Sequence, residues 1–437
     1  MLELIKKLAW DKRIVILGFG LEGQSSLRFL LSSKLIHHIV VIDQNSEIDK
    51  HPLIKENKIP SFGGADYLQY LLKDDFVIKS PGVKLEGNFA SYKTYSQTSL
   101  FLEKYQKQII GITGTKGKST TSTMIYQILK KQNKDAFLVG NIGQPAFDLV
   151  EKIKPETWIV YELSAHQLQC VSHGPAYAIL LNLMPEHLDF FKDKKSYYKA
   201  KLHIFKHQLK GSFSYISSSC KNDVISLMPV VESDEKTKVK QAQIFLNGKV
   251  VLQSSDLKYL LGTHHIQNIH AVLELVIFLN LDFNIAIESI IHFHPLPHRQ
   301  EFLGEKHGIR FVNDSISTIP QSAIQAVQAI GKVDYLILGG LDRGVAYNSL
   351  VDFLGKTNFT KVFFLGKAGA RIVQELKDKF ELIPFEITIA EKLQDLKNEL
   401  LEIKKGTVLL SPAAASYDAF KNFEERGDYF RKIFAEI

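Results

Sequence analysis

The chain contains 437 residues, and 54 Lys and Arg against 47 Asp and Glu give a net charge of +7. At roughly 100–200 residues per domain, this length predicts two to four domains, so a single small binding module is not expected. Hydrophobic residues at 45% and charged residues at 23% are typical of globular proteins and exclude a disordered or fibrous chain. The positive charge is compatible with an anionic partner, whether nucleic acid, a membrane surface or a phosphorylated small substrate.

The cysteine content and the N-terminus indicate the compartment. Cys170 and Cys220 form neither a disulfide framework nor a metal-ligand spacing, so each is expected to be a small buried side chain in a reducing cytosol. The first residues contain no continuous apolar stretch of signal-peptide length, and no run approaches the ~18 apolar residues of a membrane span. The sequence predicts a cytoplasmic protein without membrane insertion.

A strand, a glycine turn and a helix are predicted near the N-terminus. The apolar run 13–17 leads into the glycines of 18–23, and a second strand, 39–42, ends at Asp43. This spacing and context match the dinucleotide-binding fingerprint. The pattern predicts a small Rossmann-like α/β domain over residues 1–105.

Two further α/β domains are predicted. The strand 108–112 enters a glycine-rich loop and a helix, which opens a central P-loop ATPase-type domain with a parallel sheet, over 106–294. The prolines of 293–297 mark a boundary. Four short apolar strands then alternate with helical stretches, which indicates a second Rossmann-like α/β domain over 295–437.

The glycine loop at 113–120 predicts a phosphate site. A strand that feeds a glycine turn and a helix directs backbone N–H groups and the helix dipole at phosphate. Lys118 would reach the terminal phosphates, and Ser119 or Thr120 would offer a hydroxyl to Mg²⁺. Ile112 occupies the first glycine position of the strict P-loop pattern, and the alternative is a plain glycine turn. The position between a strand and a helix favours phosphate binding.

The first glycine loop remains ambiguous from its residues alone. Together with Asp43, this loop would hold NAD or FAD. The chain has a second phosphate-binding turn, however, and only one of the two turns needs to hold ATP. The first turn can therefore hold a nucleotide-linked substrate.

Two polar clusters follow central strands and contain Glu162 and His187. Because parallel strands end at one edge of a sheet, both side chains are expected to converge on the ATP phosphates with Mg²⁺. For either residue alone, a solvated loop position is the alternative.

Ten motifs in order along nearly the whole chain resemble those of the Mur ligases, the ATP-dependent amide-forming enzymes of peptidoglycan assembly. The last one is typical of the glutamate-adding branch of that family. The motifs are GFGLEG (18–23), GITGTKGKST (111–120), GNIG (140–143), YELSAHQL (161–168), NLMPEHLDFF (182–191), YYKAKLHIF (197–205), LPHRQE (296–301), VNDSIST (312–318), LGGLDRG (338–344) and SPAAASYDAFKNFEERGDYF (411–430).

The resemblance implies an ATP site with two Mg²⁺ ions. Lys118, Glu162, His187 and Lys201 would act at the reacting phosphates, with Lys201 carbamylated by CO₂. The implied metal ligands are Ser119, Glu162, His187 and carbamylated Lys201. The implied ATP contacts are Gly114, Thr115, Lys116, Gly117, Lys118, Ser119, Thr120, Asn268, Arg299 and Asp314.

The resemblance also implies that the first domain binds UDP rather than NAD, as part of the substrate UDP-N-acetylmuramoyl-L-alanine. This acidic substrate, together with ATP, accounts for the positive charge. The implied substrate contacts are Leu21, Glu22, Asp43, Gln44, Gly82, Asn141, Ser164 and His187.

The amino-acid site departs from the family. A lysine that commonly helps to hold glutamate is replaced by Ile316, so we expect a different grip, with Arg343 binding a carboxylate through two hydrogen bonds. D-glutamate is the expected substrate and L-glutamate the alternative. The expected glutamate contacts are Thr318, Arg343, Ser416 and Phe423.

Other classes of function stay open at this point. An NAD-linked oxidoreductase would need no ATP, a non-catalytic nucleotide-binding protein would tolerate loss of Lys118 or Lys201, and a folate polyglutamate ligase would lack the UDP-binding domain. We expect an enzyme that acts as a monomer in the cytoplasmic synthesis of peptidoglycan precursors, without binding nucleic acid.

Overall fold

The computed structural model describes the chain except for residues 34–37, 141–143, 187–189, 229–235, 261–264 and 295. It divides into two compact units. Unit 1 comprises Met1–Lys240, Ile244–Lys249 and Gln267–Ser289, and unit 2 comprises Gln241–Gln243, Val250–Ile266 and Ile290–Ile437.

The first sheet of unit 1 is parallel, with the strand order β3-β2-β1-β4-β5. Alternate residues of its central strands enter two apolar clusters, so both faces are covered, as expected for a Rossmann-like sheet. The strands are β1 (Ile14–Leu17), β2 (Ile39–Asp43), β3 (Ser61–Gly63), β4 (Phe76–Lys79) and β5 (Thr94–Tyr95), and the helices are α1 (Leu2–Leu8), α2 (Leu21–Ser32), α3 (Pro52–Glu56) and α4 (Gln97–Tyr105).

The second sheet of unit 1 is also parallel, with the order β10-β9-β6-β8-β7. Helix α5 packs on β6, β7 and β8. The strands are β6 (Ile109–Thr113), β7 (Ala136–Gly140), β8 (Trp158–Glu162), β9 (Tyr177–Leu180) and β10 (Phe213–Ile216), and the helices are α5 (Lys118–Lys131), α6 (Ala165–Leu168), α7 (Lys194–Leu202), α8 (Lys221–Ile225), α9 (His265–Phe278) and α10 (Phe283–Ile291).

A small three-stranded sheet lies between α8 and α9 in the sequence, within a polar segment where only short strands were expected. Its strands are β11 (Thr237–Lys240), β12 (Gln243–Leu246) and β13 (Lys249–Gln253).

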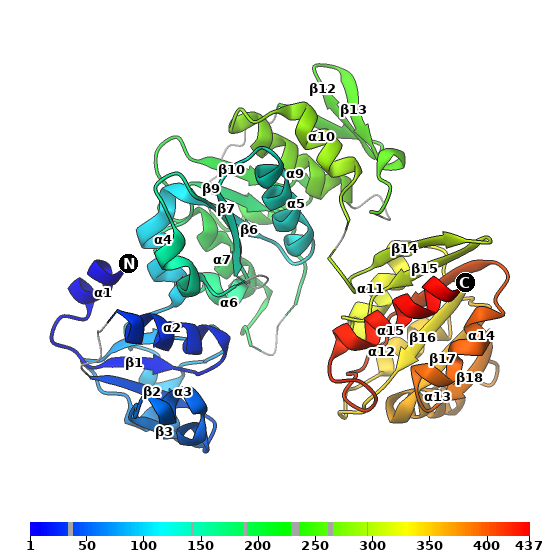
Figure 1. Ribbon diagram of the computed structural model, residues 1–437, viewed down its shortest axis with the longest axis horizontal. Coiled ribbons are helices and arrows are strands. Elements are labelled where there is room, and N and C mark those ends of the chain that lie inside the picture. Colours follow the sequence, from blue (N-terminus) through cyan, green and yellow to red (C-terminus); the bar gives the residue numbers. More distant parts are fainter. Residues whose placement is uncertain (34–37, 141–143, 187–189, 229–235, 261–264, 295) are drawn as a thin grey trace. The chain divides into compact units, whose positions relative to one another are not determined.

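The sheet of unit 2 has the order β14-β15-β19-β16-β17-β18. One apolar cluster joins a face of it to α11–α13, and a second joins the other face to α14 and α15 (Figure 1). The strands are β14 (Glu301–Lys306), β15 (Ile309–Asn313), β16 (Tyr335–Gly339), β17 (Lys361–Leu365), β18 (Glu386–Ala390) and β19 (Gly406–Leu410), and the helices are α11 (Pro320–Ile330), α12 (Asn348–Leu354), α13 (Gly366–Lys379), α14 (Lys397–Leu401) and α15 (Phe423–Glu436).

The predicted class, an α/β chain with three parallel-sheet domains, is confirmed. The C-terminal sheet has one antiparallel edge strand, because β14 pairs with β15 in antiparallel fashion, with an irregularity between Phe302 and Gly304. Cys220 is buried as expected, but Cys170 is only half-buried. Among the described helices, none is long and apolar enough to cross a membrane.

Candidate active site

The glycine loop joins β6 to α5 in the predicted strand–loop–helix arrangement. Gly114 and Gly117 have φ angles of +155° and +82°, a region that L side chains rarely adopt. Gly117 immediately precedes the first residue of α5, Lys118. The Lys118 amine donates to the carbonyls of Gly114 and Thr115, both at 3.0 Å. The loop and the start of the helix thus form an anion-binding turn with a lysine folded over it.

The loop is tied to the ends of the two neighbouring strands. Asn182, beyond β9, accepts from the Lys116 N–H at 2.8 Å, and the Lys116 amine contacts Glu186 at 2.9 Å. On the other side, Glu162 ends β8, is fully buried and pairs in register with Ile112. Glu162 thus lies at the carboxyl end of the strand next to the one that enters the glycine loop, and its contact with the ATP phosphates stays a prediction. His187 lies outside the described residues.

Lys201 reaches the same loop from α7. Its side chain is 1% exposed, and its amine donates to the carbonyl of Gly114 at 2.8 Å and lies 4.8 Å from the Tyr197 ring centroid. Burial, followed by the positive charge of Lys118, lowers the pKa of Lys201 well below its usual value. The structure therefore favours a neutral, nucleophilic amine next to the phosphate loop.

Asn268, on α9, packs directly on the loop. A Cβ atom built on Gly117 would lie 2.6 Å from Oδ1 of Asn268, so only glycine fits between them. The contact between Gly117 and Asn268 could not be predicted from the sequence, because about 150 positions of the chain separate the two residues.

The first glycine loop lies at the carboxyl edge of the N-terminal sheet. Asp43 ends β2, and its two oxygens accept from the N–H groups of Phe19 at 2.6 Å and Asn45 at 2.8 Å. Leu21 is 76% exposed at the start of α2, and Gln44 and Gly82 are also exposed. These residues follow the adjacent strands β1, β2 and β4, which is where open α/β sheets bind ligands.

Glu22 is placed differently from its neighbours in the predicted substrate set. Its Oε1 accepts from the amide of Gln167 at 2.8 Å, and burial raises the pKa of its carboxyl. Ser164 caps α6, accepting from the Gln167 N–H at 3.2 Å. Glu22 and Ser164 thus hold α2 and α6 in place within unit 1. Asn141, the other predicted contact here, lies outside the described residues.

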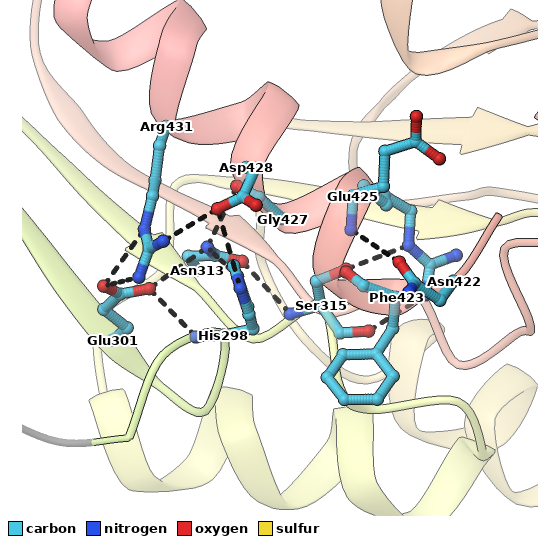
Figure 2. A network of polar contacts seen from close by, with 11 residues as sticks. His298, Glu301, Asn313, Ser315, Asn422, Phe423, Glu425, Gly427, Asp428 and Arg431 are labelled. Carbon is cyan, nitrogen blue, oxygen red and sulfur yellow. Dashed lines mark hydrogen bonds and ion pairs between the residues drawn. The ribbon is translucent and has the colours of Figure 1, made fainter. Parts of the chain in front are cut away.

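Arg299 and Asp314 lie together in unit 2. Asp314 is buried, and its carboxylate accepts from the Gln300 N–H at 3.1 Å and the Ser411 hydroxyl at 2.7 Å. Burial raises the pKa of Asp314 to about 6. His298 directly precedes Arg299, and its backbone carbonyl accepts a hydrogen bond from the Ile316 N–H at 3.1 Å. Nδ2 of Asn313 lies 3.0 Å from Nδ1 of the His298 ring (Figure 2).

The predicted glutamate contacts lie on segments at one edge of the C-terminal sheet. Thr318 follows β15, Arg343 follows β16 and Ser416 follows β19, three adjacent parallel strands. Phe423 begins α15, whose first turn lies beside Ser315 (Figure 2). The carboxyl ends of these strands therefore gather the four predicted residues on neighbouring loops.

Arg343 is exposed, but the turn that carries it is held firmly. Arg371, on α13, binds the two oxygens of Asp342 at 2.7 and 2.9 Å and donates to the carbonyl of Val345 at 2.6 Å. Its guanidinium carbon lies 4.6 Å from the ring centroid of Tyr347. Arg371 could not be identified from the sequence, because it lies in a helix without motif residues.

The chain matches two family models. The Mur ligase middle domain matches residues 112–276, and the MurD-like N-terminal domain of Mur ligases matches residues 12–91. A UDP-N-acetylmuramoylalanine--D-glutamate ligase from Clostridium kluyveri is 30% identical over 456 residues, covering 97% of this chain and 96% of the relative. The enzyme of the same name from Elusimicrobium minutum is 31% identical over 454 residues, covering 98% of each.

Solved structures share the fold. A UDP-N-acetylmuramate-alanine ligase from Thermotoga maritima is similar with a TM-score of 0.54 and 19% identity, over 97% of this chain and 98% of that one. A MurF ligase from Thermotoga maritima has the same TM-score of 0.54 and 19% identity, over 86% of this chain and 93% of that one. With near-complete coverage of relatives at 30% identity or more, the chain belongs to the Mur ligase family.

Proposed function

We propose that the chain is an ATP-dependent amide ligase that adds D-glutamate to UDP-N-acetylmuramoyl-L-alanine in cytoplasmic peptidoglycan precursor synthesis. The observation that carries the proposal is the buried Lys201 amine on the carbonyl of Gly114, beside Lys118 and the end of β8. A plain nucleotide-binding loop does not need a second buried lysine. A dehydrogenase needs no ATP, so it would not require a phosphate-binding loop at this edge of the central sheet.

The reaction activates a carboxylate and then forms the amide. The carboxylate of the lactyl-alanine substrate attacks the γ-phosphorus of ATP, which gives an acyl phosphate and releases ADP. Lys118, at the phosphate loop, neutralises charge that develops on the transferred group. The amine of glutamate then attacks the acyl carbon, loses a proton and displaces phosphate. Exclusion of water protects the acyl phosphate from hydrolysis.

The donor set at the loop suits Mg²⁺. Glu162 offers a carboxylate that is fully buried, and Ser119 offers a hydroxyl that is 2% exposed, and oxygen atoms are the ligands that Mg²⁺ prefers. We assign Ser119, Glu162, His187 and carbamylated Lys201 as ligands of two Mg²⁺ ions. Bound Mg²⁺ neutralises phosphate charge and orients the phosphates.

The environment of Lys201 supports its carbamylation. The neutral amine attacks the carbon of CO₂, a nitrogen–carbon bond forms, and a proton is released. The product has a carboxylate-like group in place of a cation. The lowered pKa of Lys201 supports this step because only the neutral amine reacts.

Each predicted domain has its own ligand in this proposal. Residues 1–105 bind the UDP part of the substrate, 106–294 bind ATP and Mg²⁺, and 295–437 bind the amino acid. We retain the predicted contacts in each. The UDP-substrate contacts are Leu21, Glu22, Asp43, Gln44, Gly82, Asn141, Ser164 and His187; the ATP contacts are Gly114–Thr120, Asn268, Arg299 and Asp314; the glutamate contacts are Thr318, Arg343, Ser416 and Phe423.

D-glutamate is proposed over L-glutamate because the relatives from Clostridium kluyveri and Elusimicrobium minutum are D-glutamate ligases by name. Ile316, which stands where a lysine was expected, has its backbone N–H bonded to His298, so its loop is held although it offers no charge.

The test is phosphate release by the purified chain with UDP-N-acetylmuramoyl-L-alanine, ATP, MgCl₂ and a panel of D- and L-amino acids. We expect turnover with D-glutamate and a product heavier by one glutamyl unit. Faster turnover with L-glutamate would refute the stereochemical assignment. No turnover with any amino acid would refute the ligase assignment.

A further inference from the structure

Arg426, on the first turns of α15, is a buried cation that the proposed reaction does not yet use. Its side chain is 2% exposed. Nε donates to the hydroxyl of Ser315 at 3.0 Å, and Nη2 donates to the carbonyls of Ser315 at 2.9 Å and Ala414 at 3.1 Å. Among the described residues, Nη1 has no hydrogen-bond partner although it is inaccessible to solvent.

These bonds link the segments that carry the predicted amino-acid contacts. Ser315 lies three residues before Thr318, and Ala414 lies two residues before Ser416. The Ser315 hydroxyl in turn donates to the carbonyl of Phe423 at 2.8 Å (Figure 2). One guanidinium therefore joins the loop after β15, the loop after β19 and the start of α15.

The loop after β16 also lies against Arg426. A Cβ atom built on Gly340 would lie 3.3 Å from Nη1 and 2.4 Å from the carbonyl oxygen of Ala415. The N–H of Leu341 donates to the same oxygen at 2.9 Å. Gly340 thus lets the turn that leads to Arg343 approach the loop after β19. The three loops and the helix start that carry the predicted glutamate contacts therefore meet around this side chain.

The environment of Arg426 is unfavourable for a cation. Its three hydrogen bonds all go to uncharged oxygens, and burial lowers its pKa to about 10. A buried cation without a carboxylate in those bonds stabilises a fold poorly compared with apolar residues of similar volume. The geometry is instead suited to fixing loop positions, because one planar group with several donors sets the distances between its acceptors.

We propose that Arg426 is a positioning residue for the amino-acid substrate, fixing the loops of Thr318 and Ser416 and the first turn of α15 so that their contacts match one enantiomer of glutamate. The proposal rests on the proposed function and deepens it. Arg426 acts through these loops and does not itself touch the substrate.

Arg426→Met, which keeps the bulk and removes every donor, tests the proposal, with Arg426→Lys as the conservative variant. Arg431→Met is the matched control, because Arg431 lies on the same helix but binds Glu301 and Asp428 (Figure 2). Steady-state constants are measured for D-glutamate, L-glutamate, ATP and UDP-N-acetylmuramoyl-L-alanine, and folding is checked by thermal unfolding.

We expect Arg426→Met to raise the KM for D-glutamate by about 10- to 100-fold, as for the loss of charged hydrogen bonds, and to lower the preference for D- over L-glutamate. KM for ATP and for the UDP substrate should change less than about twofold, and Arg426→Lys should recover part of the loss. Arg431→Met should leave both the KM for glutamate and the preference unchanged.

If Arg426→Met does not fold, Ser315→Ala decides. It removes the hydroxyl that joins Arg426 to Phe423, and a rise of about 5-fold in the KM for D-glutamate is expected. An unchanged KM and preference in the folded variant, or an equal rise in KM for all three substrates, would overturn the proposal. Because wild type must turn over glutamate in this series, a wild type without turnover refutes the proposed function itself.

Discussion

The amine of Lys201 lies 2.8 Å from the carbonyl oxygen of Gly114, which also accepts a hydrogen bond from Lys118 at 3.0 Å. Two lysines thus share one acceptor in a buried site. Burial, followed by the charge of Lys118, lowers the pKa of Lys201. When Lys201 is replaced, the Gly114 carbonyl still accepts a hydrogen bond from Lys118. The effects of Lys201 on stability and on activity can therefore be measured separately.

We predict that Lys201→Met strongly lowers turnover without lowering stability. The folded pKa of Lys201 is lowered, so the unfolded chain binds more protons and stability falls as pH decreases from the ordinary lysine pKa of about 10.4 towards the folded value. Methionine removes this dependence. Turnover should fall about 100-fold or more, because a proposed metal ligand is lost. The Tm of the variant in CO₂-free buffer at pH 7 should equal or exceed that of wild type.

Lys199→Met is the control for this variant, because Lys199 lies on the same helix and is exposed. It should change neither turnover nor Tm. Turnover by Lys201→Met within threefold of wild type would contradict the assignment of Lys201, and so would turnover by wild type that does not depend on CO₂.

Gly117→Ala should damage ATP binding specifically. The substitution introduces a Cβ at a φ of +82°, which costs about 1 kcal/mol, and places it 2.6 Å from the Asn268 side chain. Asn268 must move, so the KM for ATP should rise about 10-fold, while KM for the UDP substrate stays constant. Steady-state kinetics with each substrate varied in turn gives both values.

Gly211→Ala separates backbone strain from this displacement. Gly211 has a φ of +81°, and nothing lies within 4 Å of a Cβ built on it. The Gly211→Ala variant should lose about as much free energy of unfolding as Gly117→Ala, with no change in the KM for ATP. An equal rise in that KM for both variants would contradict the role given to the Gly117–Asn268 contact.

Asp314→Asn should remove a pH dependence of stability. Burial raises the pKa of Asp314 to about 6, so the folded chain binds the proton more tightly than the unfolded chain, and the free energy of unfolding falls as pH rises from about 4 to about 6. The difference is on the order of 3 kcal/mol. Asparagine can still accept from Gln300 and donate to the Ser411 hydroxyl.

Denaturant unfolding of both proteins at pH 4.5 and 7.5 measures this effect. The stability of Asp314→Asn relative to wild type should increase at the higher pH. Turnover should fall, since the carboxylate is a proposed ATP contact. Parallel stability curves for the two proteins would show that Asp314 does not titrate with a raised pKa.

The phosphate loop and the sheet edges could be predicted because their signals are local. Glycines between an apolar strand and a helix specify the turn around Lys118, and parallel strands bring their carboxyl ends to one edge, which places Glu162. The antiparallel strand β14 could not be predicted as such, because the sequence EFLGEK shows no clear alternation and its pairing depends on β15.

The residues that hold the site together were not predictable in the same way. Arg426 lies 111 positions from Ser315 and Arg371 lies 29 positions from Asp342, and neither contact leaves a periodic pattern in the sequence. Glu22, a predicted substrate contact, also accepts a hydrogen bond from Gln167, 145 positions away, and the sequence did not indicate this bond. Local chemistry specifies which residue types are present, but tertiary packing selects their partners.

Arg371 is expected to act on glutamate binding through Arg343. It holds Asp342 with two hydrogen bonds, and the next residue in the turn is Arg343. Arg371→Lys loses this two-point contact, so the turn is free to move, and kcat/KM for D-glutamate should fall about 5- to 10-fold. Arg28→Lys is the matched control, since Arg28 binds both oxygens of Asp148 far from this loop in the sequence.

A double-mutant cycle shows whether the effect passes through Arg343. Arg343→Met alone should lower kcat/KM for D-glutamate by more than Arg371→Lys, because it removes the proposed carboxylate contact. If Arg371 only positions Arg343, adding Arg371→Lys to Arg343→Met should change kcat/KM less than about twofold, since the group being positioned is gone. Independent, multiplying effects would mean that Arg371 supports the site by another route, and an unchanged kcat/KM in Arg343→Met would remove Arg343 from the glutamate contacts.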